Sequence, residues 1–469
     1  MIDSYRNLIG GEMAPGANSY DVENPATLTP VGRAPLSSPA DVDLAVIAAL
    51  KASTAWGADL EARGAVMARM ADRIEANAAE LGHLLTLEHG RPLANAIGEF
   101  MGAARMLRHF AAWRPEEEIF KDGEFQRASA VRAPLGVVGL IIPWNVPIGV
   151  LHMKLAPALA AGNTVVIKPA PTTPLATLRY LELIADIVPA GVINSVTGFA
   201  DVGAALVAHP GISKISLTGS VATGRHVMRG AAETLKRLTL ELGGNDAAIL
   251  LDDIDPDKVA ANVFRSSFGN SGQICVAIKR LYVHERHFDA VVDRLKALAD
   301  AAIVGNGLDE CVQMGPLQNR LQYDVVQDLI ADSRANGATV HGGDGHPDLP
   351  GHFIRPTIVT GLARDARLVR EEQFGPVLPV LPFSDECAVI AEANAVDVGL
   401  GGSVWSADPA RAAALVTKLD AGNLFANHHG FPPDPQIPFG GVKASGFGYE
   451  LGPWGFDDFS NRKILSEVK

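Results

Sequence analysis

The chain has 469 residues, three times the roughly 150 residues of a typical single domain, so we expect at least two packed domains. Hydrophobic residues make up 48% of the chain and charged residues 20%, a composition that predicts a large buried interior and excludes an intrinsically disordered protein. The 40 Lys and Arg residues are outnumbered by 53 Asp and Glu residues, and the net charge of −13 disfavours nucleic acid or an anionic membrane surface as a partner.

The three cysteines, Cys275, Cys311 and Cys387, exclude a disulfide framework by their odd number and wide spacing, which indicates a reducing compartment. The first residues carry an acid, Asp3, and no apolar stretch of signal-peptide length. The longest strongly apolar run, 135–143, is too short to cross a bilayer. We therefore expect a cytoplasmic protein with no membrane partner.

The first hundred residues have a helical pattern. Ser38 and Pro39 form an N-cap and N1 pair, after which Val42, Val46 and Leu50 recur every four residues. Such an apolar stripe predicts a helix that packs on a core rather than one that binds a cofactor.

From 135 to 253 short β-branched runs alternate with longer amphipathic ones, which predicts an open α/β sheet with crossover helices. The expected strands are 136–142, 163–168, 191–197, 212–218 and 237–242, and the expected helices include 174–188 and 220–235. Ligands of such sheets bind at the carboxyl ends of the strands. A second α/β domain should follow, with helices at 257–267 and 287–302, a strand at 280–283 and a surface loop at 342–351.

Two strand ends could contact a nucleotide. The segment 218–224 (TGSVATG) joins a strand to a helix, where backbone N–H groups can face a pyrophosphate, but an ordinary turn explains it equally well. It differs from the GxGxxG fingerprint at Val221 and from a phosphate-binding P-loop at Arg225 and His226. Lys168 ends another strand, where it could bind a ribose or simply remain solvated.

Three polar side chains are candidates for catalysis. Cys275 follows a glycine-containing stretch that lets the backbone approach a ligand, although a lone cysteine is commonly a small buried hydrophobe. Glu241 lies between leucines on an expected buried strand, where burial moves a carboxyl group toward the range of a general base. Asn145 has an amide able to donate to an oxyanion, with turn chemistry before Pro147 as the alternative.

Eight segments carry a family resemblance. They are IIPWNVP (141–147), TVVIKPA (164–170), SLTGSVATG (216–224), LELGGN (240–245), GNSGQIC (269–275), EEQFGPV (371–377), GLGGSVWS (399–406) and PFGGVKASG (438–446). Together, in this order, they resemble the aldehyde dehydrogenase superfamily over nearly the whole chain, from about Leu8 onward.

The resemblance implies an NAD(P)-dependent oxidation of an aldehyde to its carboxylic acid. Cys275 would be the nucleophile that passes through a thiohemiacetal and a thioester, Asn145 would hold the oxyanion together with the Cys275 N–H, and Glu241 would activate the hydrolytic water. The implied cofactor contacts are Lys168 for the adenine ribose, Gly219 and Ser220 for the pyrophosphate, Glu372 for the nicotinamide ribose, Phe374 for the nicotinamide, and Trp144 for the cleft wall.

The resemblance also implies three structural parts. A nucleotide-binding domain would comprise 1–114 and 135–243, a catalytic domain 244–443, and a small β oligomerisation element 115–134 and 444–469. The last part would contain a hairpin at 121–134 and a terminal strand at 459–468, and it implies a homodimer or homotetramer.

One position departs from the family pattern. Many members carry an acid three residues after the cofactor lysine, whereas this chain has Pro171. Loss of that carboxylate removes acceptors for the NAD ribose and also removes repulsion of the NADP 2′-phosphate. We therefore expect the chain to use NAD, slightly favoured, and to tolerate NADP.

The implied aldehyde tunnel is apolar. By family position its lining residues are Val146, Val150, Met153, Ile274, Val276 and Phe439. This favours a neutral aliphatic or aromatic aldehyde, with a semialdehyde as the alternative. His428 and His429 could add polar contacts at the tunnel mouth or be exposed loop histidines.

Three other functions compete with hydrolytic oxidation. A CoA-acylating dehydrogenase would not need Glu241 as a water-activating base, and a non-catalytic relative would not need Cys275, Glu241 and Asn145 together. A metal enzyme has little support, because HERH at 284–287 is one residue short of the HExxH zinc motif.

Overall fold

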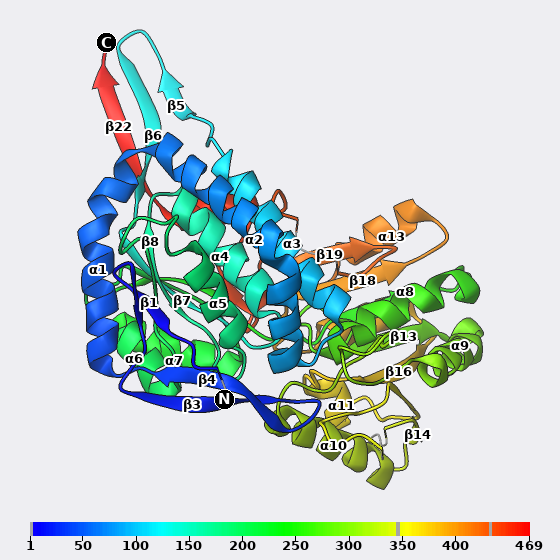
Figure 1. Cartoon of the computed structure of the whole chain (residues 1–469). Helices are drawn as coiled ribbons and strands as arrows, with labels where there is room; N and C mark the ends of the chain where they lie inside the picture. Colours follow the sequence, from blue (N-terminus) through cyan, green and yellow to red (C-terminus); the bar gives the residue numbers. More distant parts are fainter. Residues whose placement is uncertain (1–2, 344–347, 431–433) are drawn as a thin grey trace.

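The computed structural model describes residues 3–343, 348–430 and 434–469, and within them the chain forms two open α/β sheets and an antiparallel arm (Figure 1). This architecture confirms the predicted fold class. Part of the expected loop at 342–351 lies outside the described residues.

The first sheet has six strands. In spatial order they are β21 (Gly446–Phe447), β11 (Arg237–Glu241), β10 (Lys214–Thr218), β7 (Val137–Ile141), β8 (Thr164–Lys168) and β9 (Ile193–Ser195). All pairs are parallel except β21 with β11. The chain runs from β7 out to β9 and then returns to the other side of β7 at β10, so the strand order reverses between β7 and β10. Open sheets bind ligands at the carboxyl ends of strands at such a reversal.

Helices cover both faces of this sheet, because successive apolar side chains of its strands point to opposite faces and both faces must be buried. Val137 and Val166 pack on one face, whereas Val138 and Val165 pack on the other. The helices of the first face are α1 (Pro39–Ala58), α6 (Ala200–Ala208) and α7 (Val221–Ala232). The helices of the second face are α2 (Leu60–His89), α3 (Leu93–Ala111), α4 (Pro147–Ala160) and α5 (Leu175–Ile184).

Two of these helices can be compared with their predicted bounds. The predicted start of α1 is confirmed, because Ser38 caps the helix and exchanges hydrogen bonds with Asp41. The helix predicted at 174–188 is shorter, Leu175–Ile184, and the chain continues in a turn in which the N–H groups of Ile187 and Val188 donate to the carbonyl oxygen of Ile184.

The second sheet has seven strands. In spatial order they are β14 (Thr339–His341), β15 (Thr357–Thr360), β16 (Val377–Phe383), β13 (Arg280–His284), β12 (Ala247–Leu250), β18 (Gly401–Trp405) and β19 (Asn423–Ala426). Its helices are α8 (Pro256–Phe268), α9 (Phe288–Ala301), α10 (Arg320–Ala335), α11 (Arg367–Arg370), α12 (Glu386–Asn394) and α13 (Pro409–Val416). Only five residues separate β11 from β12, so the carboxyl end of the first sheet leads directly into the amino end of the second.

The arm consists of β5 (Glu118–Asp122), β6 (Gln126–Pro134) and β22 (Ser460–Val468). The terminal strand β22 pairs antiparallel with the whole of β6, and the three strands project beyond both sheets (Figure 1). The expected hairpin and terminal strand are therefore present. The proposed domain boundaries stay predictions, and β21, which we assigned to the oligomerisation element, pairs with β11 of the first sheet.

Short elements complete the chain. They are β1 (Asn7–Ile9), β2 (Glu12–Ala14), β3 (Asn18–Asn24), β4 (Thr29–Leu36), β17 (Val398–Gly399), β20 (Val442–Lys443), α14 (Gly452–Asp458) and two 3₁₀ turns, Gly269–Gly272 and Glu285–His287. Within the described part of the chain, no helix is both long and apolar enough to cross a membrane.

Candidate active site

The loop before Cys275 has a constrained backbone. Three consecutive residues adopt positive φ angles: Asn270 (53°), Ser271 (57°) and Gly272 (74°). This conformation is unfavourable for residues other than glycine unless surrounding contacts impose it. One such contact is the Ser271 hydroxyl, which donates to the carbonyl oxygen of Gly315 at 2.8 Å. The loop therefore places Cys275 at a defined position on the amino-end side of β13.

The thiol of Cys275 is strongly affected by its surroundings. Burial raises the pKa of the thiol to about 12, and the ammonium group of Lys279 opposes this rise. The carboxyl groups of Asp246, Glu241 and Glu372 raise the same pKa further. The thiol is consequently protonated at neutral pH, so nucleophilic attack requires a group that accepts its proton.

Glu241 is the last residue of β11 and is 3% exposed. Among the described residues neither of its carboxylate oxygens has a hydrogen-bond partner. Burial raises the pKa of Glu241 well above its usual range, the carboxyl of Glu450 raises it further, and Lys154 lowers it. Buried carboxylates without partners are rare because desolvation of the charge is costly. Glu241 thus has the environment of a general base.

Asn145 follows the carboxyl end of β7 and is 5% exposed. Its side-chain Nδ2 donates to the carbonyl oxygen of Gln273 at 2.9 Å, which ties it to the loop that carries Cys275. An amide has two N–H groups, so the second remains able to donate to an oxyanion next to the thiol.

Lys168 ends β8 and is almost fully buried. Burial lowers the pKa of its ammonium group to about 8, and the carboxylate of Asp201, in the first turn of α6, opposes this shift. Its Nζ donates to the carbonyl oxygen of Pro169 at 3.3 Å. A cation with one neutral partner at a strand end retains donors for the hydroxyl groups of a ribose.

Gly219 and Ser220 connect β10 to α7 at the reversal of strand order. The Ser220 hydroxyl accepts from the Thr223 N–H at 3.1 Å and caps the helix. The Gly219 N–H donates to the carbonyl oxygen of Glu241 at 3.0 Å, which joins this turn to the end of β11. The amino end of α7 therefore faces the ligand edge of the sheet, where helix N–H groups suit a pyrophosphate.

A crevice lies at this ligand edge of the first sheet, and residues 372–374 form the wall that faces the amino end of α7. The Glu372 carboxylate accepts from the Gly244 N–H at 3.2 Å, and burial raises its pKa to about 7. A Cβ at Gly243 would collide with this carboxylate, so the glycine is required for the close approach. A cavity of about 200 Å³ lies here and is lined by Val221, Gly244, Asn245, Arg370, Glu372, Val396, Asp397 and Val398.

Aromatic rings lie beside the same crevice. Trp144 and Phe374 meet edge to face, with 5.5 Å between ring centroids, and Lys279 Nζ lies 5.1 Å from the centroid of Phe374. The predicted catalytic and cofactor residues thus gather around the carboxyl edge of the first sheet and the nucleophile loop, a donor set that fits a dinucleotide.

Known proteins similar to this chain identify its family. The model of the family described as "Aldehyde dehydrogenase family" matches residues 13–465. The chain belongs to the aldehyde dehydrogenase family. It is 38% identical to a phenylacetaldehyde dehydrogenase of Pseudomonas fluorescens, over 98% of this chain and 95% of that protein.

Two solved structures show the same fold. An NADP-dependent enzyme of E. coli has a TM-score of 0.96 and 36% identity over 100% of this chain and 98% of that one. The NAD⁺ complex of an aldehyde dehydrogenase from Bacillus cereus has a TM-score of 0.96 and 34% identity over 99% and 97%. The recognised family and its dehydrogenase class are therefore confirmed.

The expected tunnel residues of this aldehyde dehydrogenase fall into two groups. Val150, Met153, Val146 and Phe439 belong to one hydrophobic cluster around α4. The other two, Ile274 and Val276, flank Cys275 on the nucleophile loop and are partly buried. All six side chains are apolar, and their contact with a substrate stays a prediction.

The structure corrects one expectation about the histidines. His429 is not an exposed loop residue, because it is 4% exposed and its Nδ1 lies 2.9 Å from the Ser403 hydroxyl. Its Nε2 lies 3.5 Å from the Asp246 carboxylate. His428 is partly buried, with its Nδ1 2.9 Å from the carbonyl oxygen of Ala426.

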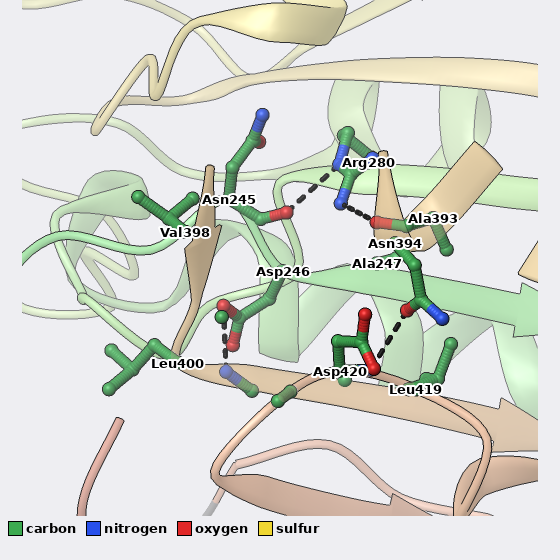
Figure 2. A pocket seen from close by; sticks show the side chains of 14 residues that line it. Asn245, Asp246, Ala247, Arg280, Ala393, Asn394, Val398, Leu400, Leu419 and Asp420 are labelled. Atoms are coloured by element: carbon green, nitrogen blue, oxygen red, sulfur yellow. Dashed lines mark hydrogen bonds between the residues drawn. The ribbon is translucent and has the colours of Figure 1, made fainter. Parts of the chain in front are cut away.

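A second, smaller cavity of about 20 Å³ lies beside Asp246 (Figure 2). Asp246 accepts from the Gly401 N–H at 3.0 Å, and Arg280 donates to the carbonyl oxygens of Asn245 and Ala393. This hollow has room for about one water molecule and is too small for a substrate. Within the described residues no cluster of three or more His, Cys, Asp or Glu is placed to hold a metal ion.

Sequence reasoning missed two buried ion pairs near the site. Lys154 pairs with Glu450, and Arg91 pairs with Glu99, with every side chain 6% exposed or less. Lys154 is a charged residue within an otherwise apolar segment, and this pattern in the sequence could have indicated a buried charge. Arg91 lies outside any helix or strand, and nothing in the neighbouring residues indicated its burial.

Proposed function

We propose that this aldehyde dehydrogenase oxidises a neutral aldehyde to its carboxylic acid, with Cys275 as nucleophile and Glu241 as base. The observation that carries the proposal is Glu241 itself, a buried carboxylate without a hydrogen-bond partner in the described chain. Its charge acts directly on the Cys275 thiol, so the two groups share one electrostatic environment.

Activation of the thiol is the first requirement. Glu241 accepts the thiol proton, directly or through water, and Lys279 stabilises the thiolate because it lowers the pKa of Cys275. The sulfur then forms a bond to the aldehyde carbon, and the carbonyl electron pair moves to oxygen. Asn145 Nδ2 and the Cys275 N–H donate to that oxyanion.

The chemistry that a bound nicotinamide cofactor supplies is hydride acceptance, which converts the thiohemiacetal into a thioester on Cys275. Lys168 would hold its adenine ribose, the turn at Gly219 and Ser220 its pyrophosphate, and Glu372 its nicotinamide ribose. The crevice and the glycine-dependent approach of Glu372 support this placement.

Hydrolysis ends the cycle. Glu241 takes a proton from water, the water oxygen bonds to the thioester carbon, and the carbon–sulfur bond breaks to release the acid. A CoA-acylating reaction would not need this base, and a non-catalytic role would leave the unpartnered carboxylate without a function.

The substrate class follows from the lining. Val146, Val150 and Met153, which belong to the hydrophobic cluster around α4, are all apolar, which favours an aliphatic or aromatic aldehyde over a semialdehyde carboxylate. The similarity to a phenylacetaldehyde dehydrogenase supports the same class.

We propose use of both cofactors, with NAD favoured. Pro171 supplies no carboxylate for the ribose hydroxyls, which favours tolerance of NADP. Asp201, however, is exposed and acts electrostatically on Lys168, so its charge repels a 2′-phosphate at the same ribose. These two effects oppose each other, and the observed selectivity should be modest.

We also propose that a second copy of the chain covers the arm. The apolar side chains Ile119, Phe120, Phe125, Val131, Ile464, Leu465 and Val468 are between 42% and 90% exposed there. Both β5 and β22 are edge strands with unpaired backbone groups, which pair readily with another strand.

An aldehyde panel tests the proposal. Reduction of NAD⁺ and NADP⁺ should be followed by absorbance with aliphatic aldehydes, phenylacetaldehyde and a dicarboxylic semialdehyde of similar length. We expect the neutral aldehydes to have the higher kcat/KM, and Cys275→Ala to abolish turnover. Turnover by Cys275→Ala would refute the nucleophile, a clear semialdehyde preference would refute the substrate class, and a thousandfold preference for NAD would refute dual use.

A further inference from the structure

A buried arginine donates a hydrogen bond to the backbone of Asn145. Arg91 lies in the short connection between α2 and α3, and its Nη2 donates to the backbone carbonyl oxygen of Asn145. Asn270 Nδ2 donates to the same carbonyl oxygen at 3.0 Å. Asn145, the residue proposed to hold the oxyanion, is thus fixed at two points. Its backbone carbonyl accepts these hydrogen bonds, and its side-chain amide donates a hydrogen bond to the carbonyl oxygen of Gln273.

Arg91 also reaches the first turn of α4 through Glu99. Its Nη1 donates to one carboxylate oxygen of Glu99, and the other oxygen accepts from the N–H groups of Ile148 and Gly149, both at 2.8 Å. The helix has no side-chain cap of its own, because its N-cap residue is Val146. Glu99 therefore caps α4 from α3, and Arg91 connects this cap to Asn145.

The geometry requires an arginine. A guanidinium directs two N–H groups in fixed directions, here toward a carboxylate and a carbonyl, whereas a lysine ammonium is a single point charge. The neighbouring His89 does not compete for Glu99, since burial and the charge of Arg91 keep its pKa well below the usual range and the ring stays neutral.

We infer that Arg91 is a positioning residue for the oxyanion amide of Asn145, an assignment that rests on the proposed roles of Cys275 and Asn145. Displacing a donor by about 1 Å costs on the order of a hundredfold in rate. Loss of the two hydrogen bonds that the Arg91 guanidinium donates to Glu99 and Asn145 should therefore slow formation and oxidation of the thiohemiacetal. The affinity for the cofactor should stay nearly unchanged.

A double-mutant cycle tests this inference. The pre-steady-state rate of NADH formation is measured for Arg91→Lys, Asn145→Ala and the double variant, with the KM for NAD⁺ determined for each. We expect Arg91→Lys alone to slow the burst about 10- to 100-fold, and to have less than about a twofold further effect when Asn145 is already alanine.

Arg63→Lys is the matched control, because Arg63 is also buried and donates to the backbone carbonyl oxygens of Trp56 and Gly57. Its burst rate should equal that of the unmodified chain. If Arg91→Lys does not fold, Asn270→Gly removes the other donor to the same carbonyl oxygen and keeps the left-handed backbone, and the same non-additivity with Asn145→Ala is expected.

Equal slowing by Arg91→Lys in both backgrounds, or an unchanged burst, would overturn the inference. This outcome is distinct from failure of the proposed function, in which the unmodified chain oxidises no aldehyde or Asn145→Ala leaves the burst unchanged.

Discussion

Replacement of Glu241 by glutamine should separate the two halves of the proposed reaction. The amide keeps the size of the side chain but cannot accept a proton from water, and loss of a positioned general base typically slows the dependent step about 10²- to 10⁴-fold. Hydrolysis of the thioester should slow by this factor. A single burst of NADH, equal to the number of active sites, should remain at high pH, where hydroxide rather than Glu241 can deprotonate the thiol.

The same substitution should stabilise the fold. The carboxyl pKa is raised from an ordinary value of 4.5 by burial, so the folded chain retains a proton that the unfolded chain loses as the pH increases. Between the unfolded-state and folded-state pKa values, each pH unit lowers the free energy of unfolding by about 1.4 kcal/mol. Glutamine cannot ionise and avoids this loss. The variant should therefore gain stability relative to the native chain as pH rises above 4.5, and the gain should vanish below it.

Two measurements check these effects. Stopped-flow absorbance separates the burst from steady-state turnover, and thermal unfolding between pH 4 and pH 8 gives the stability difference. Glu124→Gln, which changes an exposed carboxylate, is the control and should alter neither quantity. Normal steady-state turnover of Glu241→Gln, or a stability that falls below that of the native chain at pH 8, would refute the reasoning.

Three further variants test other parts of the structure. Lys154→Met leaves the buried Glu450 without its cation and should lower the free energy of unfolding by about 3–5 kcal/mol in a denaturant titration; an unchanged midpoint would contradict the buried pair. Asp201→Asn should raise kcat/KM for NADP⁺ relative to NAD⁺ about fivefold, equivalent to about 1 kcal/mol, the interaction of two charges about 4 Å apart in water; a fall in that ratio would contradict the proposed repulsion. Ile464→Asp should dissociate the assembly proposed at the arm, as measured by sedimentation velocity, and an unchanged sedimentation coefficient would contradict that proposal.

Strand ends were predictable because their sequence signals are local. Glu241 and Lys168 each follow a β-branched or leucine-rich run, and such runs end where the parallel sheet presents its ligand edge. The start of α1 was predictable for the same reason, since Ser38 and Pro39 are adjacent in sequence. In contrast, α4 was not singled out, because all fourteen of its residues are buried and no polar face marks its period.

Contacts between distant segments were not predictable. Lys154 and Glu450 are separated by 296 positions, and Arg91 and Asn145 by 54, so no local spacing indicates either pair. The burial of His429 was not predictable for the same reason. The groups that surround it, Ser403 and Asp246, are distant in sequence and come from the second sheet and the loop before it. Family motifs led to the proposed reacting residues but not to the side chains that contact and position them.

The electrostatics of the site favour transfer of the Cys275 thiol proton to the Glu241 carboxylate over its release to solvent. Burial raises the pKa of both Cys275 and Glu241, and the negative charge of Glu241 raises that of Cys275 further. Ionising both groups together is therefore unfavourable, whereas transfer of the thiol proton to the carboxylate keeps the total charge constant. Lys279 favours charge on the sulfur and Lys154 favours charge on the carboxylate, so the two lysines act on opposite ends of the same transfer. Under the proposed mechanism, a site arranged in this way generates the thiolate for attack and, once the sulfur is acylated and uncharged, returns Glu241 to the ionised form that activates water.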